Sequence, residues 1–402
     1  MNYRTSRLHQ LVVMGAGLIL LPFMTSCDKS EPDSTIDESN MDRVILVYAV
    51  NHSSLKYDFK SDSTEICKAM QNIDLSQYQV LVYKTIDLNN TGLYKFEKKS
   101  GGKNEFKEVN IYPRDITSTD SGRLQKVVED ALSLYPQATY DMIFWGHGTA
   151  WVEGNDNTDV QTTKRGPEKA YGGEYTGFKN PNGSAETSWM NIEDLSSALP
   201  NKKFDKIWFD CCYMSSIEVI YELRDKCNYY IGYPTEVMSE GMSYDIVLPY
   251  LLRKEPDFIG AAKSFFKNYN DHSVPATVAV LDMSQLPAVV NAAREIIKTG
   301  FTCPSSSDMV NYSRMSTKLV DFLTYYSEIA NHNNRQELAT ALKQAFDKMV
   351  LYQDASAKDF RGFEWDRSKI HGISTFYLID ENDDNSAYYK NLEWYKTVYN
   401  SN

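Results

Sequence analysis

The sequence has few of the features that would tie a protein to disulfides, metals or polyanions. Its six cysteines are irregularly spaced, which argues against a disulfide framework. It has no Cys-Xaa-Xaa-Cys pair and no His-Glu-Xaa-Xaa-His motif to indicate a metal site. Lysine and arginine number 42 against 54 acidic residues, and the net charge of -12 argues against nucleic acid or an anionic bilayer as the main partner. We also find no internal repeat.

The first 26 residues have the pattern of a secretion signal. Arg4 and Arg7 precede the apolar stretch 11–23, which is too short to be a comfortable membrane span. Small residues then lead to Cys27, a pattern similar to a bacterial lipobox, in which the cysteine is lipidated and becomes the first mature residue. Met24 stands where a lipobox usually has leucine. We expect a lipid anchor at Cys27; the alternative is ordinary secretion, in which Cys27 has no role.

Loss of residues 1–26 removes two arginines and no acids, so the net charge changes from -12 to -14. Residues 27–41 are mostly acidic and polar, which predicts a flexible tether. About 375 mature residues can bury one large core or two ordinary ones. We expect a core domain at 42–300 and a helical and strand region at 301–402 that packs on it, either as extra layers or as a small second domain.

Short apolar runs alternate with amphipathic stretches, a rhythm typical of a parallel sheet with helices on its faces. Strands are expected at residues 43–48, 79–83, 141–145, 206–209, 228–232, 277–281 and 373–379, with a hairpin excursion at 93–96 and 106–109. Helices are expected at residues 63–72, 123–135, 190–199, 217–223, 258–269, 287–298, 319–329 and 338–351, and at the C-terminus. Residues 152–188 show little periodicity and predict a long functional or cleavable loop.

Two of the expected strands end in residues that do chemistry. The run Asp141-Met-Ile-Phe-Trp-Gly leads to His147, and Lys206-Ile-Trp-Phe-Asp leads to Cys211 and Cys212. If the two strands are parallel neighbours, the imidazole and a thiol emerge together at the carboxyl edge, where open α/β sheets place their active sites. That is the layout of a cysteine nucleophile with a histidine base.

A cysteine needs help to react, because only its thiolate attacks. The segment after Cys212 is expected to become a helix, whose first amides and dipole would favour an anion. His147 would accept the thiol proton and later protonate the leaving amine. The backbone amides of Gly148 and Cys212 would form a hole for the oxyanion, and glycine allows the close approach.

These segments resemble a known family. Gly146-His-Gly-Thr-Ala-Trp151 and Phe209-Asp-Cys-Cys-Tyr-Met-Ser-Ser-Ile-Glu-Val219 are similar to blocks of the clostripain family of cysteine peptidases. The similarity continues through 232–244 and 372–377, and so involves most of the mature chain. It implies an α/β, caspase-like three-layer sandwich with a mainly parallel central sheet, as in caspases, gingipains and legumains. It also implies an endopeptidase that forms an acyl-thioester.

The family pattern Asp-Ala-Cys puts Cys212 at the nucleophile position and Cys211 at the alanine position. Cys211 stays open as the alternative nucleophile, since pleat alternation lets only one of the two enter a given pocket. Clostripain-like enzymes cut after Arg or Lys because carboxylates line the pocket for that residue. The resemblance gives this role to Asp210, with Glu240 as a second carboxylate; Asp210 could instead cap local amides. Ser215 replaces the small Gly or Ala common in the family.

His371 is the rival base, because it also precedes a glycine. It comes before its expected strand, whereas His147 follows one, so the two histidines would lie at opposite edges of a parallel sheet. We therefore predict a structural role for His371.

Calcium activates some members of the family, but Asn155, Asp156 and Asp159 do not form an EF-hand pattern. We predict no metal site and no cofactor. Lys164-Arg165 and Lys169 resemble the position at which relatives cleave themselves; a solvated basic loop is the alternative.

The sequence thus predicts an exported, lipid-anchored cysteine endopeptidase that acts on proteins or peptides, with Arg or Lys before the cleaved bond. Two alternatives stay open. One is a surface-binding lipoprotein on a degenerate peptidase scaffold, which would use its many tyrosines for ligand contact. The other is a transpeptidase or amidase that uses the same dyad.

Overall fold

A nine-stranded sheet runs through the part of the chain that the computed structural model describes, which is residues 41–99, 104–152, 170–180, 183–315, 317–378 and 384–400. All of these residues fall in one structural unit that begins at Asp37. The expected signal peptide and Cys27 lie outside the described residues. Among the described residues, no helix combines the length and apolar character needed to cross a membrane.

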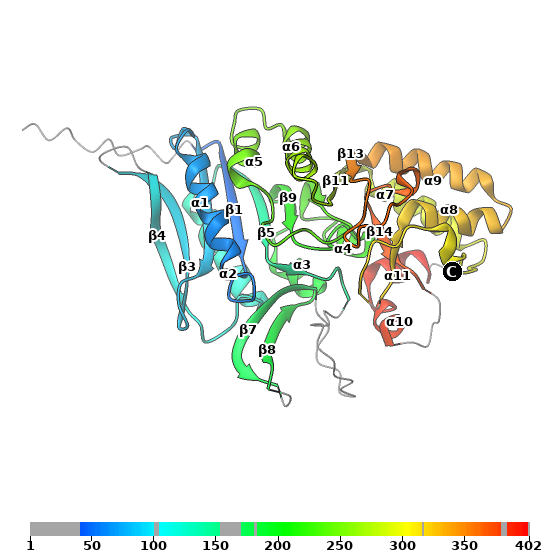
Figure 1. Cartoon of the computed structure of the whole chain (residues 1–402), viewed down its shortest axis with the longest axis horizontal. Helices are drawn as coiled ribbons and strands as arrows, with labels where there is room; N and C mark the ends of the chain where they lie inside the picture. Colours follow the sequence, from blue (N-terminus) through cyan, green and yellow to red (C-terminus); the bar gives the residue numbers. More distant parts are fainter. Residues whose placement is uncertain are drawn as a thin grey trace, which may run out of the picture. The chain divides into compact units, whose positions relative to one another are not determined.

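The centre of the sheet is parallel, and antiparallel strands extend it at both ends (Figure 1). The parallel strands follow the order β10 (Cys227–Gly232), β9 (Phe204–Asp210), β5 (Thr139–Trp145), β1 (Arg43–Ala49) and β2 (Tyr78–Thr85). Beyond β2 lie the antiparallel β3 (Asn90–Lys98) and β4 (Asn104–Pro113), and beyond β10 lie β11 (Thr277–Asp282) and β13 (Val350–Ala355). The central strands read as near-continuous apolar runs because both faces of the sheet are covered.

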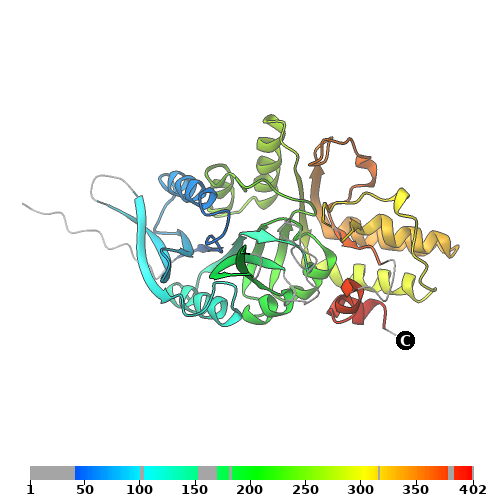
Figure 2. The same ribbon diagram turned by 60° about the horizontal axis from the view of Figure 1, so that its bottom comes forward.

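Two groups of helices cover the two faces (Figure 2). On one face, α1 (Asp58–Met70) contacts α5 (Tyr244–Leu251), which contacts α6 (Phe258–Asp271). On the other face are α2 (Ser121–Leu134), α3 (Ile192–Ala198), α4 (Ile217–Glu222) and α7 (Leu286–Ile297). The predicted α/β three-layer arrangement is therefore confirmed. The sequence did not predict α5, whose first residue, Tyr244, donates a hydrogen bond to Asp210.

The C-terminal region extends the same sheet and the second helical layer. Strand β13 joins the nine-stranded sheet, while β12 (Leu319–Asp321) and β14 (Ser374–Phe376) pair with each other. Around them lie α8 (Phe322–His332), α9 (Gln336–Met349), α10 (Asp384–Tyr389) and α11 (Glu393–Val398), with short 3-10 turns at Met283–Gln285, Ser306–Asp308 and Arg367–Lys369. Phe322 and Trp394 belong to the same buried apolar cluster as Phe209 of β9, so this region shares the core.

Three boundary predictions were wrong for local reasons. The helix predicted from residue 319 begins at Phe322, because 319–321 pair with β14 and the Asp321 carboxylate caps the helix at the Thr324 amide. The strand predicted at 373–379 is only three residues long. The predicted loop 152–188 contains a hairpin, β7 (Tyr171–Lys179) and β8 (Ala185–Met190), which pairs with β6 (His147–Gly148). Glycines in β7 hide its strand pattern.

Candidate active site

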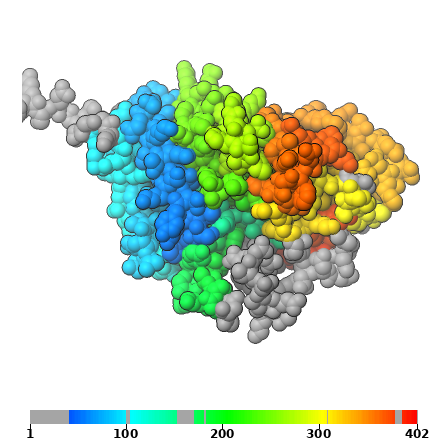
Figure 3. Space-filling view, in the orientation of Figure 1, coloured from blue at the N-terminus to red at the C-terminus, as the bar shows by residue number. Residues whose placement is uncertain are grey.

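Strands β5 and β9 are adjacent and parallel, and Trp145 of β5 lies opposite Asp210 of β9. Each strand ends two residues before His147 or Cys212, so both residues leave the sheet at the same edge. They line one cavity of about 360 Å³. The rest of its wall comes from distant segments of the chain: Leu55, Trp145, Gly146, Asp210, Glu236, Val237, Met238, Ser239, Gly241, Arg314 and Phe360. On the face of the molecule drawn in Figure 3, the lime segment lies at the surface between the blue segment and the dark-orange segment.

At Gly148 the chain passes directly against the turn that contains Cys211 and Cys212, and this leaves no room for a side chain. A Cβ atom at this position would lie 2.4 Å from the carbonyl oxygen of Cys212 and 3.0 Å from Cβ of Cys211. Real Cβ atoms do not approach a backbone oxygen so closely, so any side chain here would push the two segments apart. Gly148 thus lets its backbone pack directly against the backbone of Cys212.

The turn after Cys212 has an unusual backbone. Tyr213 has a φ of 62°, in the left-handed region that a bulky residue rarely adopts. Its amide donates to the carbonyl of Thr235 at 2.8 Å. Helix α4 begins only at Ile217, so Cys212 lies outside its first turn and gains little from its dipole, which acts over one turn. The expected help from this helix is therefore not available to Cys212.

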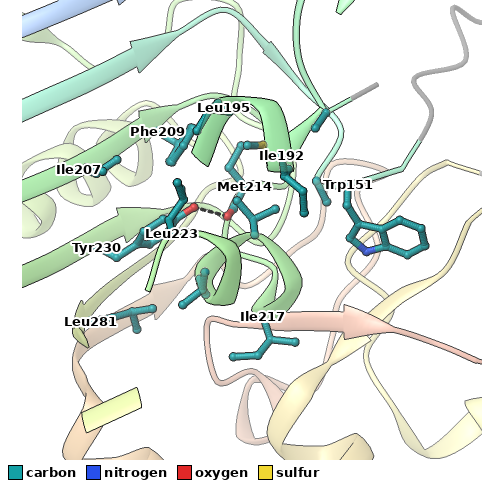
Figure 4. Packing of buried hydrophobic residues seen from close by; sticks show 14 of the residues in the cluster. Trp151, Ile192, Leu195, Ile207, Phe209, Met214, Ile217, Leu223, Tyr230 and Leu281 are labelled. Carbon is teal, nitrogen blue, oxygen red and sulfur yellow. Dashed lines mark hydrogen bonds between the residues drawn. The ribbon is translucent and has the colours of Figure 1, made fainter. Parts of the chain in front are cut away.

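Buried apolar side chains support this turn from below (Figure 4). Met214, Ile217 and Phe209 of β9 are fully buried and belong to the same apolar cluster. The hydroxyl of Tyr230 donates to the carbonyl oxygen of Met214 at 2.5 Å. The position of Cys212 is thus set by the core of the sheet and not by a flexible surface loop.

The sulfur of Cys212 touches one backbone segment on the cavity wall. Its Sγ lies 3.4 Å from the amide nitrogen of Val237 and 3.6 Å from the carbonyl oxygen of Val237. Burial raises the pKa of Cys212 to about 12, with smaller upward contributions from the carboxylates of Glu236 and Asp210; the Val237 amide and Arg314 act in the opposite direction. The thiol is therefore protonated near neutral pH in this arrangement.

The neighbouring thiol faces the core. Cys211 is fully buried, and its Sγ donates to the carbonyl oxygen of Phe144 at 3.3 Å. Burial raises the pKa of the Cys211 thiol well above its usual value. Cys211 is also absent from the wall of the cavity that Cys212 lines. A reagent that enters the cavity therefore meets Cys212 and not Cys211.

His147 is held by a small sheet beside the cavity. It pairs with Gly172 of β7, and its Nε2 lies 2.9 Å from the hydroxyl oxygen of Ser54. A Cβ atom at Gly173 would lie 3.1 Å from the His147 ring and 3.0 Å from Trp189. The imidazole is therefore packed in place by residues that the sequence did not single out, because β7 and β8 were not recognised as strands.

Asp210 is a buried carboxylate on the cavity wall. It accepts hydrogen bonds from the amide of Met242 at 3.1 Å and from the hydroxyl of Tyr244 at 3.2 Å. A Cβ atom at Gly241, which has a φ of 58°, would lie 2.6 Å from an Asp210 oxygen. Burial raises the pKa of Asp210 to about 7, partly offset by these two donors. The alternative interpretation predicted a cap on local amides, but the amide that Asp210 accepts is that of Met242, 32 residues along the chain. Asp210 also lines the cavity.

A second buried carboxylate lies behind the wall. Asp62 of α1 accepts a hydrogen bond from the indole Nε1 of Trp145 at 2.7 Å. Burial raises the pKa of Asp62 to about 9, and the negative charge of Asp210 acts in the same direction. No sequence motif marked Asp62, because its helix lies far from the cysteine turn in the chain.

The predicted site residue Glu240 and the rival base His371 do not line this cavity. Glu240 is exposed, and its neighbours Ser239 and Gly241 line the cavity while Glu240 does not. His371 lies just before β14, which belongs to a separate two-stranded sheet. The prediction that His371 lies at the opposite edge of the parallel sheet from His147 was therefore wrong. The Nδ1 of His371 lies 2.8 Å from an oxygen of the fully buried Asp321, which is a structural environment.

The C-terminal region adds a cation to the cavity. Arg314 forms an ion pair through Nε with Glu236, and its backbone amide donates to the hydroxyl of Tyr213 at 3.3 Å. Glu236 precedes Val237, which touches the thiol. Arg314 therefore bridges the two segments that flank Cys212. Sequence reasoning missed it because about 100 residues separate Arg314 from Cys212.

The described residues contain no group of three or more His, Cys, Asp or Glu side chains arranged to hold a metal ion. The loop residues Asn155, Asp156 and Asp159 lie outside the described residues, as do Lys164, Arg165 and Lys169.

Strands β5 and β9 thus bring the His147 imidazole and the Cys212 thiol to the wall of one cavity at the carboxyl edge of the parallel sheet. The model of the clostripain family matches residues 47–402. The chain therefore belongs to the clostripain family and is a cysteine peptidase. A comparison with curated protein sequences found no match.

Solved structures share the fold. A secreted C11 cysteine protease from Bacteroides thetaiotaomicron, in complex with an irreversible peptide inhibitor, is 24% identical with a TM-score of 0.72; the match covers 89% of this chain and 99% of that one. An inactive zymogen C11 protease from Parabacteroides distasonis is 23% identical with a TM-score of 0.73, over 90% of this chain and 99% of that one.

Proposed function

We propose that this chain is an exported cysteine endopeptidase in which Cys212 is the nucleophile and His147 is the base and acid. The observation that carries the proposal is that both side chains line one cavity, while the competing Cys211 and His371 do not. The cavity also contains a buried carboxylate, Asp210, suited to a basic substrate side chain.

The proposed reaction begins from a protonated thiol, because burial raises the pKa of Cys212. The substrate carbonyl carbon enters the cavity, and His147 takes the thiol proton as Sγ attacks that carbon. The amides of Gly148 and Cys212 stabilise the oxyanion. His147 then protonates the leaving amine as the C–N bond breaks, which leaves an acyl-thioester on Cys212. Water, deprotonated by His147, hydrolyses the thioester and restores the thiol.

The same proposal assigns a preference for Arg or Lys before the cleaved bond to Asp210. Its two hydrogen-bond donors, Met242 and Tyr244, are neutral groups, so a cationic side chain would supply the counter-charge that they lack. Such charge-assisted hydrogen bonds are worth about 1.5–3 kcal/mol. Glu240 does not reach the cavity wall, so it is left out of this assignment.

The test compares the two thiols in otherwise identical proteins. Cys212→Ala should abolish hydrolysis of Arg and Lys peptides and leave the far-UV and near-UV circular dichroism unchanged. Cys211→Ala is the matched control and should keep its activity, because its sulfur faces the core. Activity of Cys212→Ala at the parental rate would refute the assignment.

A peptide electrophile separates this proposal from the two alternatives. Since one neighbour was solved with an irreversible peptide inhibitor, a lysine-terminated peptide with a thiol-reactive group is a suitable probe. It should label Cys212, and His147→Ala should slow the labelling. A binding lipoprotein would show no selective labelling. A transpeptidase would transfer the acyl group to added amines, which product mass spectrometry would detect.

Export by a lipoprotein signal is part of the proposal. It rests on the segment 1–26 and Cys27, and the description of the Bacteroides thetaiotaomicron neighbour as secreted agrees with export. Cys27→Ser should release the mature protein from the membrane fraction. A variant that stays in that fraction in the same amount would contradict lipidation at Cys27.

The basic residues between the catalytic pair form the last part of the proposal. We propose that self-cleavage occurs at Lys164-Arg165 or at Lys169, and the description of one neighbour as an inactive zymogen agrees with a precursor form. N-terminal sequencing of the incubated protein should find a new chain that begins after one of these basic residues, at Arg165, Gly166 or Ala170. The Cys212→Ala protein, incubated alone, should stay as one chain.

A further inference from the structure

A second cavity, of about 340 Å³, adjoins the candidate active site. Phe360 lines the first cavity, and its chain neighbours Asp359 and Arg361 line the second. Likewise, Arg314 lines the first cavity and Asn311 lines the second. Because consecutive Cα atoms are about 3.8 Å apart, the two cavities lie on either side of one thin ridge. In Figure 3 the dark-orange and yellow segments that supply this ridge lie side by side on the same face.

The ridge and the second cavity are built from a rigid hairpin. The buried carboxylate of Asp359 accepts the amides of Arg361 at 2.8 Å and Phe363 at 3.0 Å. The Phe363 carbonyl in turn accepts the amide of Asp359 at 2.9 Å. The indole Nε1 of Trp365 donates to the carbonyl of Ser356 at 2.7 Å. These contacts fix the hairpin before any ligand arrives, which lowers the entropy that binding would cost.

The second cavity combines charged groups with an exposed aromatic ring. Asp359 pairs with the Arg361 guanidinium, and the carboxylate of Asp366 accepts the Ser368 amide and hydroxyl. Glu364 and Lys369 add one charge of each sign to the wall. The aromatic ring of Phe363 is 66% exposed at the cavity wall, which is unusual for so large an apolar side chain. Met309 and Val310 add buried apolar surface.

We propose that this second cavity is a distal subsite that binds a large apolar or aromatic side chain of the peptide substrate. The inference rests on the proposed function, because it needs a peptide in the first cavity. Two adjoining cavities of this size have centres on the order of 10 Å apart, which an extended peptide spans with about three residues. The subsite should therefore act on substrates that extend about three residues from the cleaved bond, and not on shorter ones.

The experiment uses the mature full-length protein and a ladder of fluorogenic peptides with Arg before the cleaved bond. Peptides are lengthened one residue at a time, on the amino side in one series and on the carboxyl side in the other. Each added position carries Phe or Ser. We expect kcat/KM to rise at least fivefold when Phe, but not Ser, occupies one position about three residues away in one series. Phe363→Ala should remove most of that Phe-over-Ser ratio.

The matched control is Phe178→Ala, which deletes an equally exposed ring, 74% exposed, on β7 outside both cavities. Phe178→Ala should leave the Phe-over-Ser ratio of kcat/KM unchanged. The inference is overturned if no position prefers Phe, or if the preference survives in Phe363→Ala. Both results leave the proposed function intact, because the shortest Arg peptide reports on Cys212 independently. Failure to cleave any Arg peptide would instead refute the proposed function, and this inference with it.

Discussion

The titration of Asp210 gives the sharpest prediction about specificity. Burial raises its pKa to about 7, so the fraction in the carboxylate form rises from about one tenth at pH 6 to about nine tenths at pH 8. Asp62, with its pKa raised to about 9, stays protonated over this range. A basic substrate side chain should therefore gain its counter-charge between pH 6 and pH 8.

The assay measures kcat/KM for two peptides that differ only in arginine or citrulline before the cleaved bond. Citrulline has nearly the same shape as arginine but no charge. Titration of the thiol and the imidazole affects both peptides equally, so it cancels in the ratio. The Arg-over-citrulline ratio should rise by about tenfold from pH 6 to pH 8, and the profile of kcat/KM reports the free enzyme.

Asp210→Asn is the matched perturbation, because the amide keeps the shape of the carboxyl group and removes its charge. The loss of about 1.5–3 kcal/mol corresponds to a drop of about 10- to 150-fold in the ratio at pH 8. The ratio in this variant should also become independent of pH. A ratio that stays flat with pH in the parent, or survives in Asp210→Asn, would refute the role of Asp210.

Folding stability gives an independent measure of the same titration. Because burial raises the folded-state pKa of Asp210, the unfolded chain ionises first as pH rises. The free energy of unfolding should therefore fall from about pH 4 to about pH 7, by an upper limit of roughly 4 kcal/mol for a shift of about three pKa units. Asp210→Asn should lose this part of the decline in urea unfolding. An unchanged pH dependence would place the Asp210 pKa near its ordinary value.

Four further variants test the supporting structure. Gly148→Ala should lower stability by about 1–3 kcal/mol and reduce activity, because its Cβ would clash with the Cys212 carbonyl; an active, equally stable variant would contradict the close approach. Glu236→Gln should lower the midpoint pH of iodoacetamide alkylation of Cys212, and Arg314→Gln should raise it; shifts of the same sign would contradict the charge assignment. The fully buried Glu218 accepts hydrogen bonds from the Thr375 hydroxyl at 2.9 Å and the Phe376 amide at 3.0 Å. Glu218→Ala should therefore cost about 2–4 kcal/mol in denaturant unfolding, because it removes the acceptor from both donors; a neutral effect would argue against these two hydrogen bonds.

The sequence by itself determined the central strands, because their apolar runs are nearly uninterrupted. It also determined where the imidazole and the thiol leave the sheet, since residues after adjacent parallel strands meet at one edge. Helix bounds were predicted to within a few residues where the apolar period was strong, as in α2 and α7. Strands β7 and β8 were missed because the glycines of β7 carry no side-chain pattern.

Only the tertiary structure decided which of the adjacent thiols meets the cavity. The alternation of side chains along a strand allows either, and only the resemblance to the family favoured Cys212; in the structure Cys211 donates to a core carbonyl while Cys212 touches Val237 on the cavity wall. The structure also brought Asp62 and Arg314 to the site from opposite ends of the chain. Their positions depend on packing between remote segments, and such contacts leave no local periodicity in the sequence to be read.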